Sequence, residues 1–329
     1  MTITFASLFT GGGGADIGAT QAGLTPIWGI EKEGKIFEVA SRNMSHDHQM
    51  FLSDVRDFDW NVIKPHNRPD WLHASPPCVN ASTANNGKET QEDISLAQAI
   101  CRAIETLKPQ YFSLENVAGY KYYKSFKLIN DELIDNLGYF WDWQVLDAYW
   151  FGVPQNRKRL FLVASRNQFA HRWIKVSREK SHWYDAIADL IPTLPECKLT
   201  ESQKKRLFDE FEILNINHLN PARLPNLAIQ NSGSRKDKDG NPKNTIRLAK
   251  DPVWTIRAMS GNVRPNPHQA TLIVDGKVLR PTIQCYARWQ TFPDDYQWSE
   301  DFKLNMRICG NAVPPKFFAQ LIKGVISGT

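Results

Sequence analysis

Short apolar runs alternate with helical patterns over the first 165 residues. The apolar runs have strand length and predict strands at residues 3–9, 26–31, 70–75, 110–114 and 159–165. Between them, apolar positions spaced three and four residues apart predict helices at residues 15–22, 96–107 and 126–137. This alternation is typical of an α/β fold, and we expect a Rossmann-like, mostly parallel sheet with helices on both faces.

After about residue 185 the pattern becomes irregular. Prolines recur, short β-like pieces appear at 253–257 and 270–274, and a helical pattern returns only at 315–326. We therefore expect three parts. They are a larger α/β domain at 1–185, a smaller irregular β-rich domain at 186–280, and a segment at 281–329 whose helix packs back on the first domain.

Composition narrows the class of protein. The chain has 329 residues, 42% of them hydrophobic and 23% charged, which is typical of a globular protein with a buried core. No run of about 18 apolar residues predicts a membrane span, and the start lacks the pattern of a signal peptide. The five cysteines are scattered without a CxxC pair, and no HExxH pattern occurs. We expect a cytoplasmic protein with no disulfide framework and no metal.

The distribution of charge is more informative than its sum. The net charge is +5, and residues 231–250 alone contribute +4 in a stretch with two glycines and a proline. Two interpretations are open. The stretch is either a solvated surface loop, or a segment that contacts phosphates through Arg235, Lys236, Lys238 and Lys243.

Glycines at 11–14 follow the first predicted strand. Glycines allow a sharp turn and a close approach of the backbone to a ligand. Glu31 ends the second strand, where a carboxylate can accept hydrogen bonds from both hydroxyls of a ribose. The run is neither GxGxxG nor a P-loop, since no GK[ST] follows. It indicates a nucleotide-like cofactor and no more than that.

Reactive side chains flank three further predicted strands. Cys78 stands after two prolines that fix the backbone, Glu115 follows the strand at 110–114, and Arg157 and Arg159 lead into the strand at 159–165. Ligands bind at the carboxyl edge of such sheets, so these groups would converge there, with Cys78 as a nucleophile. Individually, each also suits an ordinary buried cysteine or a salt-bridged residue.

Taken in order, these blocks resemble the C5-cytosine DNA methyltransferase family of bacterial restriction–modification systems. The matching motifs are FxGxG at 9–13, Pro-Cys at 77–78, ENV at 115–117, QxRxR at 155–159, a hinge block at 280–294 and GN(S/A)V at 310–313. The resemblance covers the chain except roughly 186–250, where the family's target-recognition region varies. It implies a DNA (cytosine-5-)-methyltransferase.

The resemblance also implies roles for single residues. Cys78 would add to C6 of cytosine, Glu115 would hydrogen-bond N3 and the exocyclic amine, and Arg159 would hold O2 and favour the thiolate, with Arg157 in the same catalytic group. The cofactor would be S-adenosylmethionine. The residues that bind it would be Phe9, Thr10, Gly11, Gly13, Gly14, Glu31, Asp54, Pro77, Asn311 and Val313.

The partner implied is duplex DNA, from which the target base must be flipped. The polar loop at 79–91 would close over that base, and 186–280 would read the sequence. The predicted DNA-contacting residues are Ser82, Asn85, Gln155, Arg235, Lys236, Lys238, Lys243, Arg257, Asn262 and Arg264. We expect a monomer, with a cognate restriction endonuclease as its genetic partner.

Four departures from the family pattern stand out. Val79 replaces a Gln after the catalytic Cys, Ser7 replaces an Asp, Lys32 replaces an aromatic residue beside the adenine, and Gln284-Cys285 replaces an Arg-Glu pair. None of them removes a group that makes or breaks bonds.

Three alternatives remain. A tRNA cytosine-5 methyltransferase is disfavoured because its Cys-Phe-Thr element is missing and the insert is large. A catalytically inactive DNA-binding relative is disfavoured because Cys78, Glu115 and Arg159 are retained. A nucleotide-dependent oxidoreductase would account for the glycine loop, but it gives Cys78 and the two arginines no role.

Overall fold

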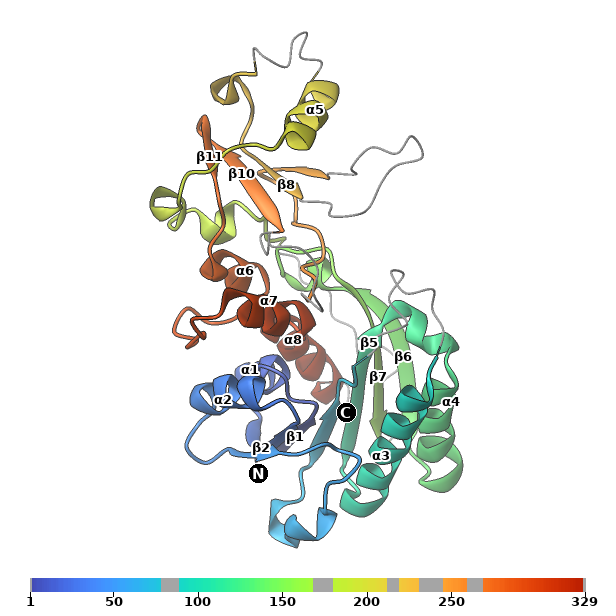
Figure 1. The fold of residues 1–329 in the computed structure, drawn as a ribbon. Coiled ribbons are helices and arrows are strands. Elements are labelled where there is room, and N and C mark those ends of the chain that lie inside the picture. The colour runs from blue at the N-terminus through green and yellow to red at the C-terminus, as the bar shows by residue number, and fades with distance from the viewer. Residues whose placement is uncertain are drawn as a thin grey trace.

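A seven-stranded sheet forms the centre of the larger domain (Figure 1). The protein is described here by a computed structural model that covers residues 2–77, 89–167, 180–211, 219–230, 245–258 and 269–327. The strand order is β3-β2-β1-β4-β5-β7-β6. The strands are β1 (Thr4–Leu8), β2 (Thr25–Glu31), β3 (Gln49–Leu52), β4 (Trp71–Ala74), β5 (Tyr111–Val117), β6 (Phe140–Asp147) and β7 (Lys158–Ser165).

Only β7 runs against the other strands of this sheet. It pairs antiparallel with both β5 and β6, while β1 to β5 pair in parallel. The predicted strands are present, so the mostly parallel sheet is confirmed. Neither the reversal of β7 nor the strand β6 was predicted. The sequence pattern of β6 hides it, because this edge strand is only partly buried and carries polar residues.

Helices cover both faces of the large sheet, as expected. Successive strand residues point to opposite faces, so Phe5 packs in one core cluster and Ala6 in the other. Apolar residues of α3 (Gln91–Leu107) and α4 (Lys124–Asp131) pack on one face. On the other face lie α1 (Gly14–Gln21) and α8 (Pro315–Ile326).

The C-terminal helices return to the first domain. Phe317, Phe318 and Leu321 of α8, the helix expected at 315–326, are buried against β1 and β7. Two more helices, α6 (Ile283–Trp289) and α7 (Phe302–Asn311), precede it. Helix α7 also contacts α2 (Gly34–Asn43) through Ile308, which brings the end of the chain beside the glycine loop.

A smaller antiparallel sheet stands apart from the large one, at the top of Figure 1. Its order is β11-β10-β8-β9, and α5 (Glu201–Glu210) accompanies it. The strands are β8 (Leu227–Gln230), β9 (Ile246–Leu248), β10 (Ala270–Val274) and β11 (Lys277–Leu279). The β-rich character is confirmed, and β10 is the piece expected at 270–274.

The strand expected at 253–257 is wrong. Val253 forms an isolated bridge with Gln155, in which its N–H donates to the carbonyl of Pro154 at 2.9 Å. Its carbonyl accepts from the N–H of Asn156 at 2.8 Å. These bonds tie the segment to the large domain instead of the small sheet, and no local pattern in the sequence reports such a pairing.

No helix among the described residues is long and apolar enough to cross a membrane. Within the same residues, no group of three or more His, Cys, Asp or Glu side chains is placed to hold a metal ion.

Candidate active site

An ion pair lies at the edge of the sheet where β5 ends and β7 begins. Nε of Arg159 lies 3.0 Å from Oε1 of Glu115. The other carboxylate oxygen, Oε2, accepts a hydrogen bond from Oγ of Ser75 at 2.7 Å. The three residues come from neighbouring strand ends, as the sequence predicted for Glu115 and Arg159. The contribution of Ser75 was not predicted, although its place directly after β4 was a signal for it.

The pair is well shielded from water. The side chains of Glu115 and Arg159 are 6% and 15% exposed. Burial lowers the pKa of the Arg159 guanidinium below its ordinary value. A carboxylate and a guanidinium fixed in this way offer acceptors and donors that need little reorganisation when charge develops on a bound ring.

The backbone that leads to Cys78 is fixed beside this pair. The side-chain amide of the buried Asn116 donates to the carbonyl of Pro76 at 3.2 Å, and its own oxygen accepts from the N–H of Val117 at 2.8 Å. Pro77, predicted for the cofactor site, is exposed and next in the chain. Cys78 itself lies outside the described residues.

The predicted cofactor loop turns sharply after β1. Phe9, Gly11 and Gly13 all have positive φ, at 60°, 57° and 78°. The N–H of Thr10 donates to the carbonyl of Ile30, and that of Gly13 to the carbonyl of Thr10, both at 2.9 Å. Positive φ suits glycine, which explains two of these residues by their backbone alone. A Cβ at Gly11 would meet no atom closer than 4.0 Å, so this side of the loop is open.

Glu31 faces the same loop from the end of β2. Its two carboxylate oxygens each accept a backbone N–H at 2.9 Å, Oε2 from Gly11 and Oε1 from Glu33. Burial is the main influence on its pKa, which is raised above the ordinary value. Each oxygen keeps a second lone pair, so the carboxylate is oriented and still able to accept from hydroxyl groups.

Asp54 follows β3 at the neighbouring strand end. Nε of Arg56 donates to Oδ1 at 2.9 Å and its NH2 group to Oδ2 at 2.6 Å, while Nζ of Lys32 lies 3.9 Å from Oδ2. The hydrogen bonds from Arg56 lower the pKa of Asp54 to about 2. The predicted adenine-facing carboxylate is thus already paired with a guanidinium, which the sequence pattern did not show.

The C-terminal segment touches the loop as the motif at 310–313 implied. Val313 is buried, and a Cβ at Gly14 would overlap its carbonyl oxygen. Asn311 is exposed. Two contacts were not predicted: the hydroxyl of Tyr296 donates to the carbonyl of Gly12 at 2.8 Å, and a Cβ at Gly12 would overlap Ile308. These close contacts give glycine a packing role at 12 and 14.

Arg157 does not join Glu115 and Arg159. Its buried guanidinium donates to three backbone carbonyls, those of Ile256 at 3.2 Å, Gly310 at 3.0 Å and Ala312 at 2.9 Å. The predicted membership of the catalytic group does not fit these contacts. They fit a residue that holds the C-terminal motif and the segment around 256 against the large domain.

Gln155 is fully buried beside Arg157. Its side-chain oxygen accepts from the N–H of Ile256 at 3.0 Å, and its amide donates to the carbonyl of Trp289 at 3.2 Å. The predicted contact with DNA does not fit this placement, since a side chain without exposed surface cannot reach a base or a phosphate unless the segment rearranges.

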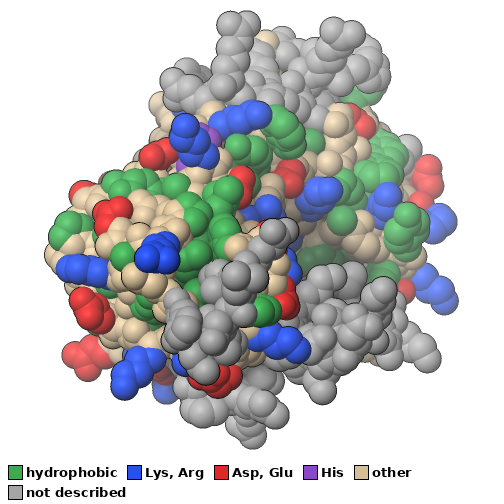
Figure 2. Space-filling model, turned by 90° about the horizontal axis from the view of Figure 1, so that it is seen from above, with side chains coloured by type: hydrophobic (Ala, Val, Ile, Leu, Met, Phe, Trp, Pro, Cys, Tyr) green, Lys and Arg blue, Asp and Glu red, His purple; other side chains and the backbone are tan. Residues whose placement is uncertain are grey.

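Most of the other predicted DNA-contacting residues lie outside the described residues. These are Ser82, Asn85, Arg235, Lys236, Lys238, Lys243, Asn262 and Arg264. Arg257 is described and exposed. Figure 2 views the molecule from above, and on this face basic side chains are spread among hydrophobic and acidic ones.

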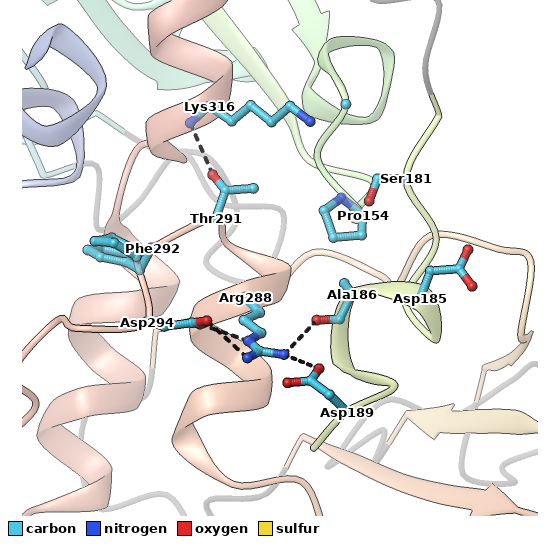
Figure 3. Close-up of a pocket in the computed structure, with 12 residues that line it drawn as sticks. Pro154, Ser181, Asp185, Ala186, Asp189, Arg288, Thr291, Phe292, Asp294 and Lys316 are labelled. Carbon is cyan, nitrogen blue, oxygen red and sulfur yellow. Dashed lines mark hydrogen bonds and ion pairs between the residues drawn. The ribbon is translucent and has the colours of Figure 1, made fainter. Parts of the chain in front are cut away.

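A cavity of about 580 Å³ lies between the C-terminal helices and the segment at 181–189 (Figure 3). Arg288 of α6 is central to it and forms ion pairs with Asp189 and with Asp294, the latter at 2.8 Å. The pairs raise the pKa of Arg288 and use its donors. No lining residue belongs to the predicted catalytic, cofactor or DNA-contacting sets, so the cavity marks a joint between segments.

Comparisons with known proteins agree with this arrangement. The family model described as C-5 cytosine-specific DNA methylase matches residues 3–327. The type II methyltransferase M1.HphI of Haemophilus parahaemolyticus is 26% identical over 344 residues, covering 99% of this chain and 87% of that protein. M.MthTI of Methanothermobacter thermautotrophicus, also named a type II methyltransferase, is 26% identical over 348 residues, covering 99% and 97%.

A solved structure shares the fold. The Entamoeba histolytica methyltransferase EhMeth matches 99% of this chain and 98% of its own, with a TM-score of 0.63 and 15% identity. At this identity the likeness shows the fold alone.

Proposed function

Because this chain belongs to the C-5 cytosine-specific DNA methylase family and is a DNA (cytosine-5-)-methyltransferase of the type II restriction–modification kind, we propose that it acts on a flipped cytosine through a covalent bond between Cys78 and C6. The observation that carries this proposal is the buried Glu115–Arg159 pair, at 3.0 Å, beside the fixed backbone that leads to Cys78.

The reaction follows from what these side chains can do. The Cys78 thiolate forms a bond to C6, and the electron pair released from the C5–C6 double bond makes C5 nucleophilic. Glu115 hydrogen-bonds the N3 side of the ring as N3 gains a proton, and Arg159 donates to O2. S-adenosylmethionine, when bound, would supply the methyl group to C5 and be left as S-adenosylhomocysteine. The C5 proton then leaves to a base, N3 gives up the proton that it gained, the C6–S bond breaks, and the thiolate is restored.

The residues around the glycine loop fit this cofactor. The open side of Gly11 gives it space, and Glu31 is already oriented by two backbone N–H groups. We propose that Glu31 accepts the ribose hydroxyls, that Phe9, Thr10, Gly11, Gly13 and Gly14 line the methionine and adenosine, and that Pro77, Asn311 and Val313 close the site. Asp54 would face the adenine with Arg56 still paired to it.

The division of the chain remains part of the proposal. Residues 1–185 would bind cofactor and catalyse, 186–280 would read the DNA sequence, and 281–329 would join the two. The separate antiparallel sheet and the return of α8 to the large sheet support this division. The enzyme would act as a cytoplasmic monomer that protects DNA from a cognate endonuclease, and the type II relatives support that role.

The decisive experiment is transfer of labelled methyl from S-adenosylmethionine to duplex DNA, with tRNA as the competing substrate, followed by mapping of the modified base. We expect 5-methylcytosine in a defined duplex sequence. Label in tRNA alone would establish the alternative tRNA enzyme, and binding of DNA without transfer would establish the inactive relative.

The covalent step has its own test. Duplex DNA with 5-fluorocytosine at the mapped position should form a complex that survives denaturant, because fluorine does not leave C5 as a proton does. Cys78→Ser should abolish both the complex and methyl transfer while it retains cofactor and DNA binding. Cys101→Ser, which alters a buried thiol in α3, is the matched control and should keep both the complex and methyl transfer. A denaturant-stable complex with Cys78→Ser would overturn the assignment.

A further inference from the structure

A chain of buried polar groups lies beneath the glycine loop. Oγ of Ser7 lies 3.0 Å from both carboxylate oxygens of Asp16 and 2.8 Å from Oγ1 of Thr10. Nε2 of His48 lies 3.3 Å from Oδ1 of Asp16. The side chains of Asp16 and His48 are 0% and 1% exposed, so this carboxylate is stabilised by protein groups instead of bulk water.

The chemistry of the groups fixes the direction of the bonds. An ionised carboxylate only accepts, so the single hydroxyl hydrogen of Ser7 points to Asp16. In the Thr10–Ser7 contact Thr10 must then be the donor, and the same hydroxyl also lies 3.3 Å from the carbonyl oxygen of Ser7. The hydrogen bonds therefore run from the loop residue Thr10 through Ser7 to Asp16. The charge of the Asp16 carboxylate strengthens the bond that Ser7 donates to it.

The residues around these hydrogen-bonded side chains are closely packed. A Cβ at Gly29, which pairs with Ser7 on the neighbouring strand, would overlap Oγ1 of Thr10. A Cβ at Gly13 would overlap the terminal methyl of Met44, so the segment that carries His48 also packs against the loop. Ser7 and Asp16 thus hold the loop through Thr10, while Glu31 holds it through the N–H of Gly11.

We propose that Asp16 is a positioning residue for the cofactor, which keeps the loop at 9–13 in its binding conformation through Ser7 and Thr10. The inference rests on the proposed cofactor site. Asp16 touches neither cofactor nor substrate in this account. Three residues of the loop have positive φ, and the polar chain is what favours this conformation in the free protein.

Titration calorimetry with S-adenosylhomocysteine, on the full chain without DNA, tests this role. Asp16→Asn keeps the size and removes the charge, and it should weaken binding by about tenfold or more. KM for the cofactor should rise in proportion while kcat at saturating cofactor stays near the wild-type value, because bound cofactor restores the loop. DNA affinity should not change.

Exchange of the two groups provides a rescue. Ser7→Asp alone places two carboxylates in contact and should weaken binding, whereas Ser7→Asp combined with Asp16→Ser restores one carboxylate and one hydroxyl and should recover most of the affinity. Ser113→Ala is the matched control, since it removes another buried hydroxyl, bonded to Trp71 and His73, and should leave cofactor affinity unchanged.

Wild-type affinity in Asp16→Asn would overturn the proposal, and so would equal losses in Asp16→Asn and Ser113→Ala. If Asp16→Asn fails to fold, Ser7→Ala removes only the hydroxyl that links Thr10 to Asp16 and must show the same loss. Absence of binding by the wild-type protein would instead refute the cofactor site on which the inference depends.

Discussion

Nε of Arg159 lies 3.0 Å from Oε1 of Glu115, across two antiparallel strands, where β5 ends and β7 begins. The register places Val117 opposite Arg159, so the two charged side chains reach each other diagonally. Each partner is buried enough that loss of the other leaves a poorly solvated charge. The pair is therefore sensitive to the loss of either partner.

Glu115→Gln should lower kcat by about 10²- to 10³-fold, because the amide cannot stabilise the positive charge that develops on the ring N3. Single-turnover methyl transfer and cofactor titration measure the two effects separately. Cofactor affinity should stay near the wild-type value. Asp142→Asn, at a more exposed carboxylate of β6, is the control and should leave kcat intact. An unchanged kcat in Glu115→Gln would remove this residue from the mechanism.

Glu31→Ala should weaken cofactor binding by about tenfold or more, since charge-assisted hydrogen bonds contribute about 1.5–3 kcal/mol each. The pKa of Glu31 is raised by burial, and only the ionised form accepts from both hydroxyls. Cofactor affinity should therefore fall as the pH is lowered from neutrality through this raised pKa, and the variant should lose that dependence. Calorimetry at several pH values measures the affinity and its pH dependence. Equal affinities of Glu31→Ala and the wild-type protein would refute the assignment.

Arg157→Met should lower the free energy of unfolding by about 3 kcal/mol or more, because it leaves the carbonyls of Ile256, Gly310 and Ala312 without their donor. Denaturant unfolding measures the change. Arg68→Met, at an exposed position, is the control and should change stability by less than about 0.5 kcal/mol. A stable Arg157→Met enzyme with lost activity would return this residue to the catalytic group.

Stability should depend on pH through His73. Burial lowers the pKa of His73 to about 3, so between pH 6.5 and 3 the unfolded chain binds a proton that the folded protein does not. The free energy of unfolding should fall over this window as the pH is lowered, by up to about 1.4 kcal/mol per pH unit from this group. His73→Phe should make the slope shallower. An unchanged slope would show that His73 titrates normally.

The basic residues of 231–250 should contact phosphates. A fourfold change of Arg235, Lys236, Lys238 and Lys243 to Gln should weaken cognate and scrambled duplexes alike and flatten the log–log salt slope by about 0.9 per lost contact. A loss confined to the cognate duplex would make the segment part of the sequence reader, and unchanged slopes on both would leave a solvated loop. The control changes four exposed lysines, Lys64, Lys108, Lys303 and Lys323.

Local patterns in the sequence determined much of this protein. The strand and helix alternation predicted the α/β sheet, and the order of motifs predicted that Glu115 and Arg159 meet at one edge. The sheet follows from rules that act over a few residues, because side chains alternate along a strand and parallel strands end at a common edge. The meeting of Glu115 and Arg159 depends in addition on the reversal of β7, which brings its beginning beside the end of β5. The return of α8 to the sheet was also visible in its apolar spacing.

Tertiary structure alone decided the roles of residues whose partners lie far along the chain. Arg157 and Arg159 share a motif, yet one binds carbonyls up to 155 residues away and the other binds Glu115. Gln155 is polar and resembles a surface residue, but the fold buries it against Ile256 and Trp289. In the sequence Asp16 is an ordinary polar residue of a short helix. Only the fold places Ser7 of β1 in contact with it. The physical reason is that burial and hydrogen-bond partners depend on packing between distant segments, which no local periodicity records.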